Sequence, residues 1–383
     1  MLTVKANPKI VVALSGGPHS AAAAALLKSQ GYEVIAIFFR FGSESFRSHC
    51  VLGSQLESAK RVAEKLGLSL QIAEVEAPFE AEVVDYFVHE CLQLRSPSPC
   101  VRCNSRVKFE YLLKAADRFG CSQAATGHRA QIFHDLTNSS FRVSRGVEPS
   151  RDQSFLLFEL TQSQLQRCVF PMGALTHAMT LKIVREFDLF PEGQTPTDSG
   201  SPNGACFIND PSYRELVAQR VDRRLRPPGS IQREDGSVVG THDGLYGLKI
   251  GQSQDLELNL PPDEAKSMVV VGFDAARNGA VVSDESALLS KTVLASKASW
   301  LSTPPGFGIR GLECEVQAGS NFEANPCRVT FFENSQVRVE FSSPQRSLSP
   351  GQSLAFYLGD ELLGGAYISE IEARAGSKRG NIS

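Results

Sequence analysis

The chain has 383 residues, more than the roughly 250–300 at which a single hydrophobic core stops growing, so two or three domains are expected. A hydrophobic fraction of 42% and a charged fraction of 21% exclude a disordered or fibrous protein. There is no apolar run of about 18 residues and no secretory signal, which predicts a cytoplasmic protein without a membrane span. The net charge of −3 offers nucleic acid no global attraction, so any RNA binding must rest on local patches.

From residue 10 onward, short apolar runs alternate with helical stretches. This order is typical of βαβ units and predicts a doubly wound, Rossmann-like α/β domain with a parallel sheet. The expected strands are 10–14, 33–39, 68–75 and 122–126, and the expected helices are 21–30, 54–66, 79–94 and 107–119.

Residues 191–210 are rich in Pro, Gly, Ser, Thr and Asn, which marks a loop at the edge of the first domain. Strand and turn signals follow over 227–251, with Asp235-Gly236 as a hairpin turn. Short β-rich runs over 292–372 predict a small sandwich or barrel. The expected domains are 1–210, which binds nucleotide, 211–285, which is small and β-rich, and 286–383, the C-terminal β domain.

The segment after the first strand carries the first chemical signal. Ser15, Gly16 and Gly17 join a buried strand directly to a helix, with Pro18 in its first turn. Glycines let backbone N–H groups approach an anion, and the helix dipole favours negative charge there. The lysine of a Walker A loop is absent. The loop therefore predicts a phosphate site of another type, and the alternative is a tight turn without a ligand.

Cysteines provide the second signal. Nine of them at irregular spacing, with no export signal, argue against a disulfide framework. Cys100 and Cys103 lie on a proline-constrained loop that enters the helix expected from Val107, and Arg102 between them is expected to lower the thiol pKa. Cys206 ends the Pro/Gly stretch, where a thiol could approach another cysteine and withdraw. Ordinary thiols are the alternative, and the cysteines at 50, 91, 121, 168, 314 and 327 are interpreted that way.

Taken in order, these motifs resemble the tRNA-specific 2-thiouridylases, which belong to the PP-loop ATP pyrophosphatases. The resemblance covers about residues 8–368. Its motifs are Ala13 to Ser20, Pro97 to Asn104 with Lys108-Phe109, Ala125 to His128, Arg151 to Leu156, Phe170 to Gly173, Ala205 to Ile208, His242 to Leu245, Ile250 to Gln252, and Pro344 to Arg346 with Pro350 to Gln352. The resemblance implies a PP-loop domain, a small central β-rich domain and a C-terminal β-barrel.

The resemblance also implies a reaction. ATP would adenylate the C2 oxygen of the wobble uridine (position 34) of tRNA, and a persulfide on Cys206 would deliver sulfur while AMP leaves. Cys103 matches the nucleophile that can form a transient disulfide with Cys206. Cys100 stands where many members have Asp, so a [4Fe–4S] cluster on Cys100, Cys103 and Cys206 is the competing route. The partners implied are tRNA and a sulfur-donor protein, with no membrane.

The binding residues follow by position. The ATP site would comprise Ala13, Leu14, Ser15, Gly16, Gly17, Pro18, His19, Ser20, Phe39 and Gly127. The tRNA contacts would be His128, Arg151, Asp152, Gln153, Gln317, Ala318 and Gln352, where Gln317-Ala318-Gly319 replaces a basic run of the family.

One departure concerns magnesium. His19 replaces an acidic residue expected to help hold the Mg²⁺ that accompanies ATP, and imidazole is a poor ligand for Mg²⁺. Two alternatives therefore stay open. One is a diverged paralogue with impaired adenylation that acts as a sulfur carrier, iron–sulfur or RNA-binding protein, and the other is a PP-loop ligase acting on a small molecule.

Overall fold

The computed structural model describes residues 7–42, 51–191, 205–208, 213–222, 224, 227–302, 311–319 and 323–372. Its first sheet is entirely parallel and has the order β3-β2-β1-β4-β7. These strands are β1 (Lys9–Ala13), β2 (Glu33–Arg40), β3 (Ser69–Glu74), β4 (Gln123–Ala125) and β7 (Cys168–Val169). The chain order reverses between β1 and β4, and open α/β sheets bind ligands at such a switch point. The predicted Rossmann-like domain is confirmed.

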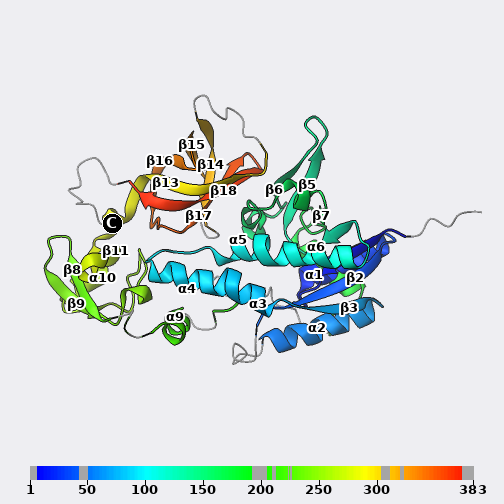
Figure 1. The fold of residues 1–383 in the computed structure, drawn as a ribbon, viewed down its shortest axis with the longest axis horizontal. Helices are drawn as coiled ribbons and strands as arrows, with labels where there is room; N and C mark the ends of the chain where they lie inside the picture. Colours follow the sequence, from blue (N-terminus) through cyan, green and yellow to red (C-terminus); the bar gives the residue numbers. More distant parts are fainter. Residues whose placement is uncertain are drawn as a thin grey trace, which may run out of the picture.

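Helices cover both faces of this sheet (Figure 1). Ile10 and Val12 pack towards α1 (Pro18–Ser29), α2 (Val51–Lys65) and α8 (His177–Glu186), whereas Val11 packs on the opposite face. The elements on that opposite side are α3 (Glu76–Phe79), the π turn η2 (Glu80–Val84), α4 (Asp85–Leu92), α5 (Pro99–Cys103), the π turn η3 (Asn104–Lys108) and α6 (Phe109–Arg118). Alternate side chains of β1 thus pack into the hydrophobic cores on the two faces of the sheet, as expected for a buried central strand.

The helix expected over 107–119 begins earlier than the sequence suggests. Pro99 occupies its first turn, where a fixed φ and a missing N–H suit a helix, and α5 runs on through η3 into α6. Cys100 and Cys103 consequently lie on the first helical turns, and their assignment to a loop before the helix is wrong. The helix expected from residue 79 likewise begins at Glu76.

The central sheet has the order β10-β9-β8-β12-β11. Its elements are α9 (Arg214–Arg220), β8 (Gly229–Arg233), β9 (Val238–His242), β10 (Glu257–Leu258), α10 (Pro262–Ser267), β11 (Val269–Asp274) and β12 (Gly279–Ser283). The predicted hairpin at Asp235-Gly236 is confirmed. Gly236 has φ +87°, and Asp235 Oδ1 accepts a hydrogen bond from Ser237 N at 2.9 Å.

The C-terminal strands form a closed barrel. Six strands close into a ring through the β13–β18 pairing: β13 (Leu289–Trp300), β16 (Val337–Arg346), β15 (Asn325–Phe331), β14 (Leu312–Ala318), β17 (Ser353–Leu358) and β18 (Glu361–Ile371). Closure removes the exposed sheet edge. The barrel implied by the family resemblance is confirmed.

A hairpin from the N-terminal half extends this barrel sheet. The strands β5 (Ala130–Asp135) and β6 (Ser140–Arg145) pair with each other, and β6 pairs with β18 through Leu362↔Val143. Figure 1 shows the hairpin projecting beside the barrel. It belongs to the expected 1–210 domain by sequence but shares its sheet with the C-terminal strands. The boundaries 1–210, 211–285 and 286–383 remain predictions.

Candidate active site

The conformation of the loop between β1 and α1 is fixed by hydrogen bonds of its own serines. Ser20 Oγ accepts a hydrogen bond from Ser15 N at 3.1 Å and donates one to Gly17 O at 3.0 Å. Gly16 has φ +82°, and a side chain there would place its Cβ 2.3 Å from the carbonyl oxygen of Gln55. No side chain caps the N-terminus of α1, and its first turn holds no acidic residue. The start of α1 therefore presents an uncapped helix N-terminus with a favourable dipole, which suits a phosphate.

Gly127, which follows β4, lies against the start of α1. A Cβ at Gly127 would lie 2.7 Å from Ser20 N, so only glycine lets these two segments approach so closely. Phe39, at the end of β2, is buried and its ring centroid lies 5.8 Å from that of Phe41. The predicted ATP residues from Ala13 to Ser20 and Gly127 are thus brought together at the switch point, and their contact with nucleotide remains a prediction.

Cys100, Cys103 and Cys206 lie near one another. The charge of Cys206 would act on both Cys100 and Cys103, and the charge of Cys100 would act on Cys103. Phe207 anchors the Cys206 turn, packing edge-on to Phe79 and Phe87 at 5.8 and 5.4 Å. The structure therefore unites residues that lie far apart in the sequence.

The expected lowering of the thiol pKa is wrong. Burial raises the pKa of Cys100 to about 11 and of Cys103 to about 12. Desolvation of its thiol also raises the pKa of Cys206, although the residue as a whole is exposed. Lys108 opposes that shift at all three thiols. Arg102 turns away, because its Nε donates to Glu82 O at 2.5 Å and its guanidinium lies over the Tyr86 ring. From the sequence, Lys108 was recognised only as part of a motif five positions after Cys103, and its effect on the three thiols was not predicted.

Metal binding by these thiols is a separate question. Within the described ranges, no group of three or more His, Cys, Asp or Glu side chains is placed so that it could hold a metal ion. Cys100, Cys103 and Cys206 have the right chemistry for iron but do not fit a cluster in this arrangement. Cys91, Cys121, Cys168, Cys314 and Cys327 are buried, as expected for ordinary core thiols, and Cys50 lies outside the described residues.

His128 is a buried, neutral imidazole. Its Nδ1 lies 2.7 Å from Thr126 Oγ1, and its ring stacks on Phe109 at 5.5 Å. Burial lowers the pKa of His128 to about 3, and the positive charges of Lys108 and Arg129 lower it further. The interpretation of His128 as a solvent-facing loop histidine is therefore excluded.

The residues expected to contact tRNA are engaged within the protein. The carboxylate of Asp152 accepts hydrogen bonds from Gly146 N at 2.9 Å, Ser154 N at 3.1 Å and Ser154 Oγ at 2.7 Å, and Arg145 lies 3.4 Å away. Gln153 Oε1 accepts from Arg129 N at 3.1 Å. Arg151 forms an ion pair with Glu148 at 3.5 Å.

Arg145 connects this element to the barrel. It donates to Gln317 Oε1 at 3.2 Å and stacks over the Tyr357 ring at 3.6 Å. Gln352 Nε2 in turn donates to Ala318 O at 2.8 Å. Asp152, Gln317, Ala318 and Gln352 therefore form one network, in which sequence reasoning missed Arg145. Their contact with RNA remains a prediction.

The loop before Cys100 is docked on the barrel. Ser96 N donates to Pro350 O at 2.7 Å, and Ser98 Oγ accepts from Ser353 N at 3.1 Å. Gly351, with φ +86°, packs against residues 95 and 96, since a Cβ there would lie 3.0 Å from Arg95 Cβ. The C-terminal barrel thus positions the helix that carries both cysteines.

A second link joins that helix to the barrel through a carboxylate. Ser105 Oγ donates to one oxygen of Glu159 at 2.5 Å, and Tyr367 OH donates to the other at 2.8 Å. A cavity of about 500 Å³ lies next to this link, with Arg102, Arg106, Glu110, Lys297 and Tyr367 among its lining residues. The cysteine helix is therefore fixed from its loop and from its outer face.

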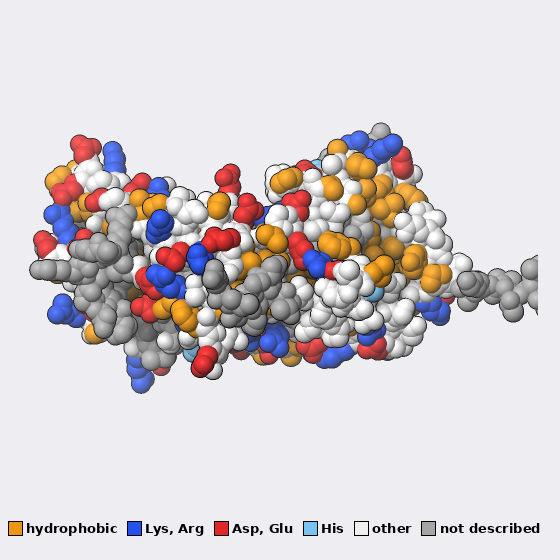
Figure 2. All heavy atoms as spheres, turned by 90° about the horizontal axis from the view of Figure 1, so that it is seen from above, with side chains coloured by type: hydrophobic (Ala, Val, Ile, Leu, Met, Phe, Trp, Pro, Cys, Tyr) orange, Lys and Arg blue, Asp and Glu red, His pale blue; other side chains and the backbone are white. Residues whose placement is uncertain are grey.

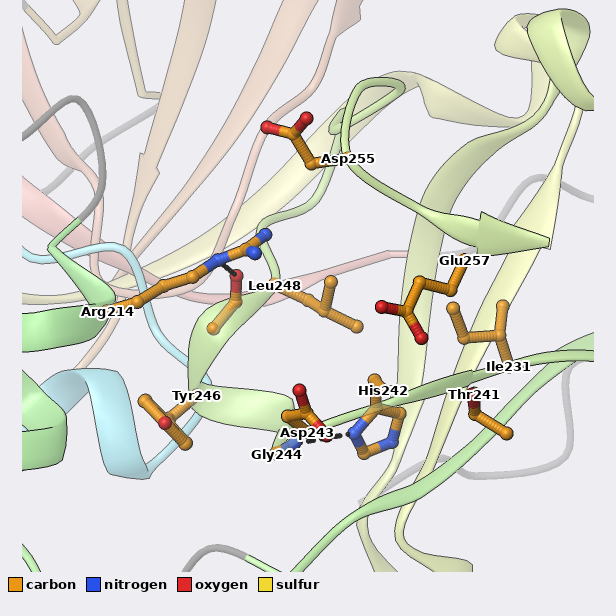
Figure 3. A pocket seen from close by; sticks show the side chains of 11 residues that line it. Arg214, Ile231, Thr241, His242, Asp243, Gly244, Tyr246, Leu248, Asp255 and Glu257 are labelled. Carbon is orange, nitrogen blue, oxygen red and sulfur yellow. Dashed lines mark hydrogen bonds between the residues drawn. The ribbon is translucent and has the colours of Figure 1, made fainter.

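The His242-Asp243-Gly244 motif organises a turn in the central sheet. It lines a pocket of about 80 Å³ with Arg214, Asp255 and Glu257 (Figure 3). His242 Nδ1 accepts from Gly244 N at 3.0 Å, and its Nε2 lies 3.2 Å from Asn278 O. Burial lowers the pKa of His242. Both ring nitrogens of His242 therefore have backbone partners, and the side chain stabilises the turn.

Where the structure describes it, the face of the molecule seen in Figure 2 has no patch made only of basic or only of acidic side chains. Acidic and basic side chains intermix there, and apolar side chains gather towards the end that holds the N-terminal sheet. Among the helices of the described segments, none is long and apolar enough to cross a membrane.

Known proteins match this chain along its length. Residues 8–210 match the family model described as the tRNA methyl transferase HUP domain, and residues 290–368 match that of the aminomethyltransferase beta-barrel domain. A tRNA-specific 2-thiouridylase MnmA from Geobacter metallireducens is 36% identical over 96% of this chain and 98% of the relative. Proteins of the same name from Geotalea uraniireducens and Heliobacterium modesticaldum are 35% and 34% identical, each over 94% of this chain and over 94% and 92% of their own lengths.

Solved structures give weaker matches. A U34-tRNA thiolase NcsA from Methanococcus maripaludis, solved with its [4Fe–4S] cluster, aligns over 57% of this chain and 65% of that one, at 17% identity and a TM-score of 0.33.

Proposed function

Since the chain belongs to the family of tRNA-specific 2-thiouridylases, we propose that it replaces the C2 oxygen of the wobble uridine of tRNA with sulfur at the expense of ATP. The observation that carries this proposal is that Cys100, Cys103 and Cys206 lie near one another and near Lys108, in a domain whose β1–α1 loop ends at an uncapped helix start. Nucleotide activation and sulfur delivery need both components next to one base.

The proposed reaction has two stages. ATP bound at the β1–α1 loop transfers AMP to the C2 oxygen of the uridine and releases pyrophosphate. The outer sulfur of a persulfide on Cys206 then attacks C2, and AMP leaves with the original oxygen. Cys103 attacks the inner sulfur of Cys206, which breaks the S–S bond, frees the 2-thiouridine and forms a Cys103–Cys206 disulfide. An external dithiol reduces that disulfide, and a sulfur-donor protein reloads Cys206.

Lys108 would support both sulfur steps. It is the cation that favours the thiolate at all three cysteines, against the effect of burial. His128 lies beside Phe109 as a neutral ring, and its buried position suits the wall of a base pocket more than a phosphate contact.

The test is a reconstituted thiolation assay with unmodified tRNA, ATP and a persulfide donor. The wild type is expected to form 2-thiouridine, detected by mass spectrometry of digested tRNA, and C206S and C103S are expected to form none. Cys121→Ser, a change at a buried thiol outside the cluster, is the control. An adenylation-impaired sulfur carrier would form neither 2-thiouridine nor pyrophosphate in this assay.

The persulfide route is tested by iron content. Protein purified without oxygen is expected to lack iron and the visible absorption of a sulfur-ligated cluster, yet to be active. Iron in stoichiometric amounts, lost together with activity on chelation, would replace this route by one through a cluster on Cys100, Cys103 and Cys206.

A further inference from the structure

Residue 19 of the phosphate loop stands in a cluster of nitrogen-bearing side chains. The Nη1 atom of Arg129 lies 3.0 Å from His19 Nε2. The ring of His177 stacks on that of His19 at 5.4 Å, with His177 Nδ1 at 3.5 Å from His19 Nε2. These side chains come from the start of α1, the segment after β4 and the start of α8. Three elements thus converge at the mouth of the loop, and Arg129 and His177 were not expected there.

The cluster is held from outside. Arg129 Nε donates to Arg151 O at 2.6 Å, and the backbones of Arg129 and Gln153 are joined by a hydrogen bond at 3.0 Å. His177 N donates to Glu148 Oε2 at 2.6 Å, and Glu148 also pairs with Arg151. The segment Arg151 to Gln153 therefore aims the Arg129 guanidinium at the loop.

Magnesium does not fit this position. Mg²⁺ requires oxygen ligands in near-octahedral geometry, whereas the groups around residue 19 are two imidazoles and a guanidinium. A guanidinium cannot ligate a metal, and its permanent charge repels a divalent cation. The same groups are good donors to phosphate oxygens, and arginine can bind two of them at once.

We propose that His19, Arg129 and His177 form a metal-free binding site for the pyrophosphate end of the nucleotide. The inference rests on the proposed function, because it assigns to this site the group that ATP releases on adenylation. His19 lies in the first turn of α1, whose N-terminus no side chain caps, so a diphosphate bound at that helix start would lie next to the nitrogen cluster. In this chain, protein nitrogens replace the cation that an acidic residue at position 19 would hold.

The test measures binding of inorganic pyrophosphate to the full-length protein by calorimetry, in EDTA and in Mg²⁺. The wild type is expected to bind pyrophosphate in EDTA. Arg129→Gln is expected to weaken that binding by about tenfold or more, as for a lost hydrogen bond to a charged group. Arg185→Gln, which removes an exposed arginine near the end of α8, is the matched control and should bind like the wild type.

A second variant tests the replacement of the cation. His19→Asp is expected to lose pyrophosphate binding in EDTA and to recover it in Mg²⁺. The wild type is expected to bind pyrophosphate in EDTA already and to gain no affinity from Mg²⁺. Absence of wild-type binding in EDTA, or equal affinities of R129Q and R185Q, would overturn the inference. The outcome is independent of thiolation: metal-free binding without 2-thiouridine formation would overturn the proposed function alone, and 2-thiouridine formation without metal-free binding would overturn the inference alone.

Discussion

At the scale of single residues, the thiols near the nucleotide loop are kept uncharged. Burial raises the pKa of Cys100 to about 11 and of Cys103 to about 12, and Lys108 opposes the shift. The thiolate is the reactive form, so Cys100 and Cys103 are unreactive in the unliganded enzyme. Ionisation of these thiols then depends on the groups that a substrate brings into the site.

Alkylation of Cys100, which is half-buried, should report this state. Labelling by iodoacetamide, followed by mass spectrometry, should rise about tenfold per pH unit from pH 7 to 10, without the plateau of a free cysteine near about 8.5. Lys108→Met should slow the labelling at every pH, because it removes the shared cation. Lys114→Met, a change at an exposed lysine paired with Glu110, is the control. A plateau near pH 8.5 would contradict the shifted pKa.

Asp152 has a structural role, whatever it contacts in RNA. Its carboxylate organises the turn at Ser154 and faces Arg145, whose side chain is 18% exposed. Asp152→Ala should lower the free energy of unfolding by about 3–5 kcal/mol, because it leaves a largely buried arginine unpaired. Asp117→Ala breaks an exposed pair with Arg167 and should cost under about 1 kcal/mol. Denaturant titrations of both variants make the comparison, and equal losses would argue against this role.

At the scale of elements, the turn at 349–353 sets the position of the cysteine helix. Gly351→Ala would press a Cβ against Arg95 and Ser96, in a backbone conformation that side chains rarely adopt. The variant is expected to lose most of its thiolation rate and to keep its affinity for ATP, because the proposed nucleotide loop of Ser15 to Ser20 takes no part in this contact. Gly359→Ala has a comparable backbone conformation with nothing within 4 Å of the added Cβ, and it should retain the wild-type rate.

A parallel loss of ATP binding in G351A would contradict this separation of roles. The measurement therefore pairs single-turnover 2-thiouridine formation with nucleotide titration of the same preparation.

Local sequence patterns predicted most helices and strands but few of the side-chain contacts between them. Strand periodicity located β1, β2, β3 and β4, and Asp235-Gly236 located a hairpin, because such patterns depend on neighbouring residues. The ordered motifs predicted that Cys103 and Cys206 act together. The roles of Lys108 and Arg129 could not be predicted, since they depend on which side chains meet after the sheet has formed. The start of the helix at Pro99 was missed because Pro and Ser also signal a loop.

At the scale of the whole molecule, buried thiols link stability to alkaline pH. Burial raises the pKa of Cys91, Cys103 and Cys168 to about 12 each and of Cys100 to about 11. A folded pKa above the unfolded value gives a contribution that is complete below about pH 8.5 and is lost as pH rises towards the folded value. The protein should therefore weaken steadily above about pH 8.5.

Chemical denaturation at pH 7, 8.5 and 10 measures this effect. Each such thiol should lower the free energy of unfolding by up to about 1.4 kcal/mol per pH unit above about pH 8.5. Cys91→Ala removes one buried thiol outside the proposed chemistry and should flatten the slope by that amount. A stability that stays level between pH 8.5 and 10 would contradict the raised pKa values.

The pairing of β18 with the β5–β6 hairpin has a consequence for synthesis on the ribosome. The hairpin emerges early, but its partner strand is the last one of the described chain, and the same strand closes the barrel against β13. The nascent chain must therefore carry an unpaired hairpin edge until β18 has been synthesised, when this non-local pairing becomes available. The turn at 349–353 that seats the cysteine helix arrives equally late. A nascent chain can thus form the loop between β1 and α1 before β18 is synthesised, but the helix that carries Cys100 and Cys103 is positioned only afterwards.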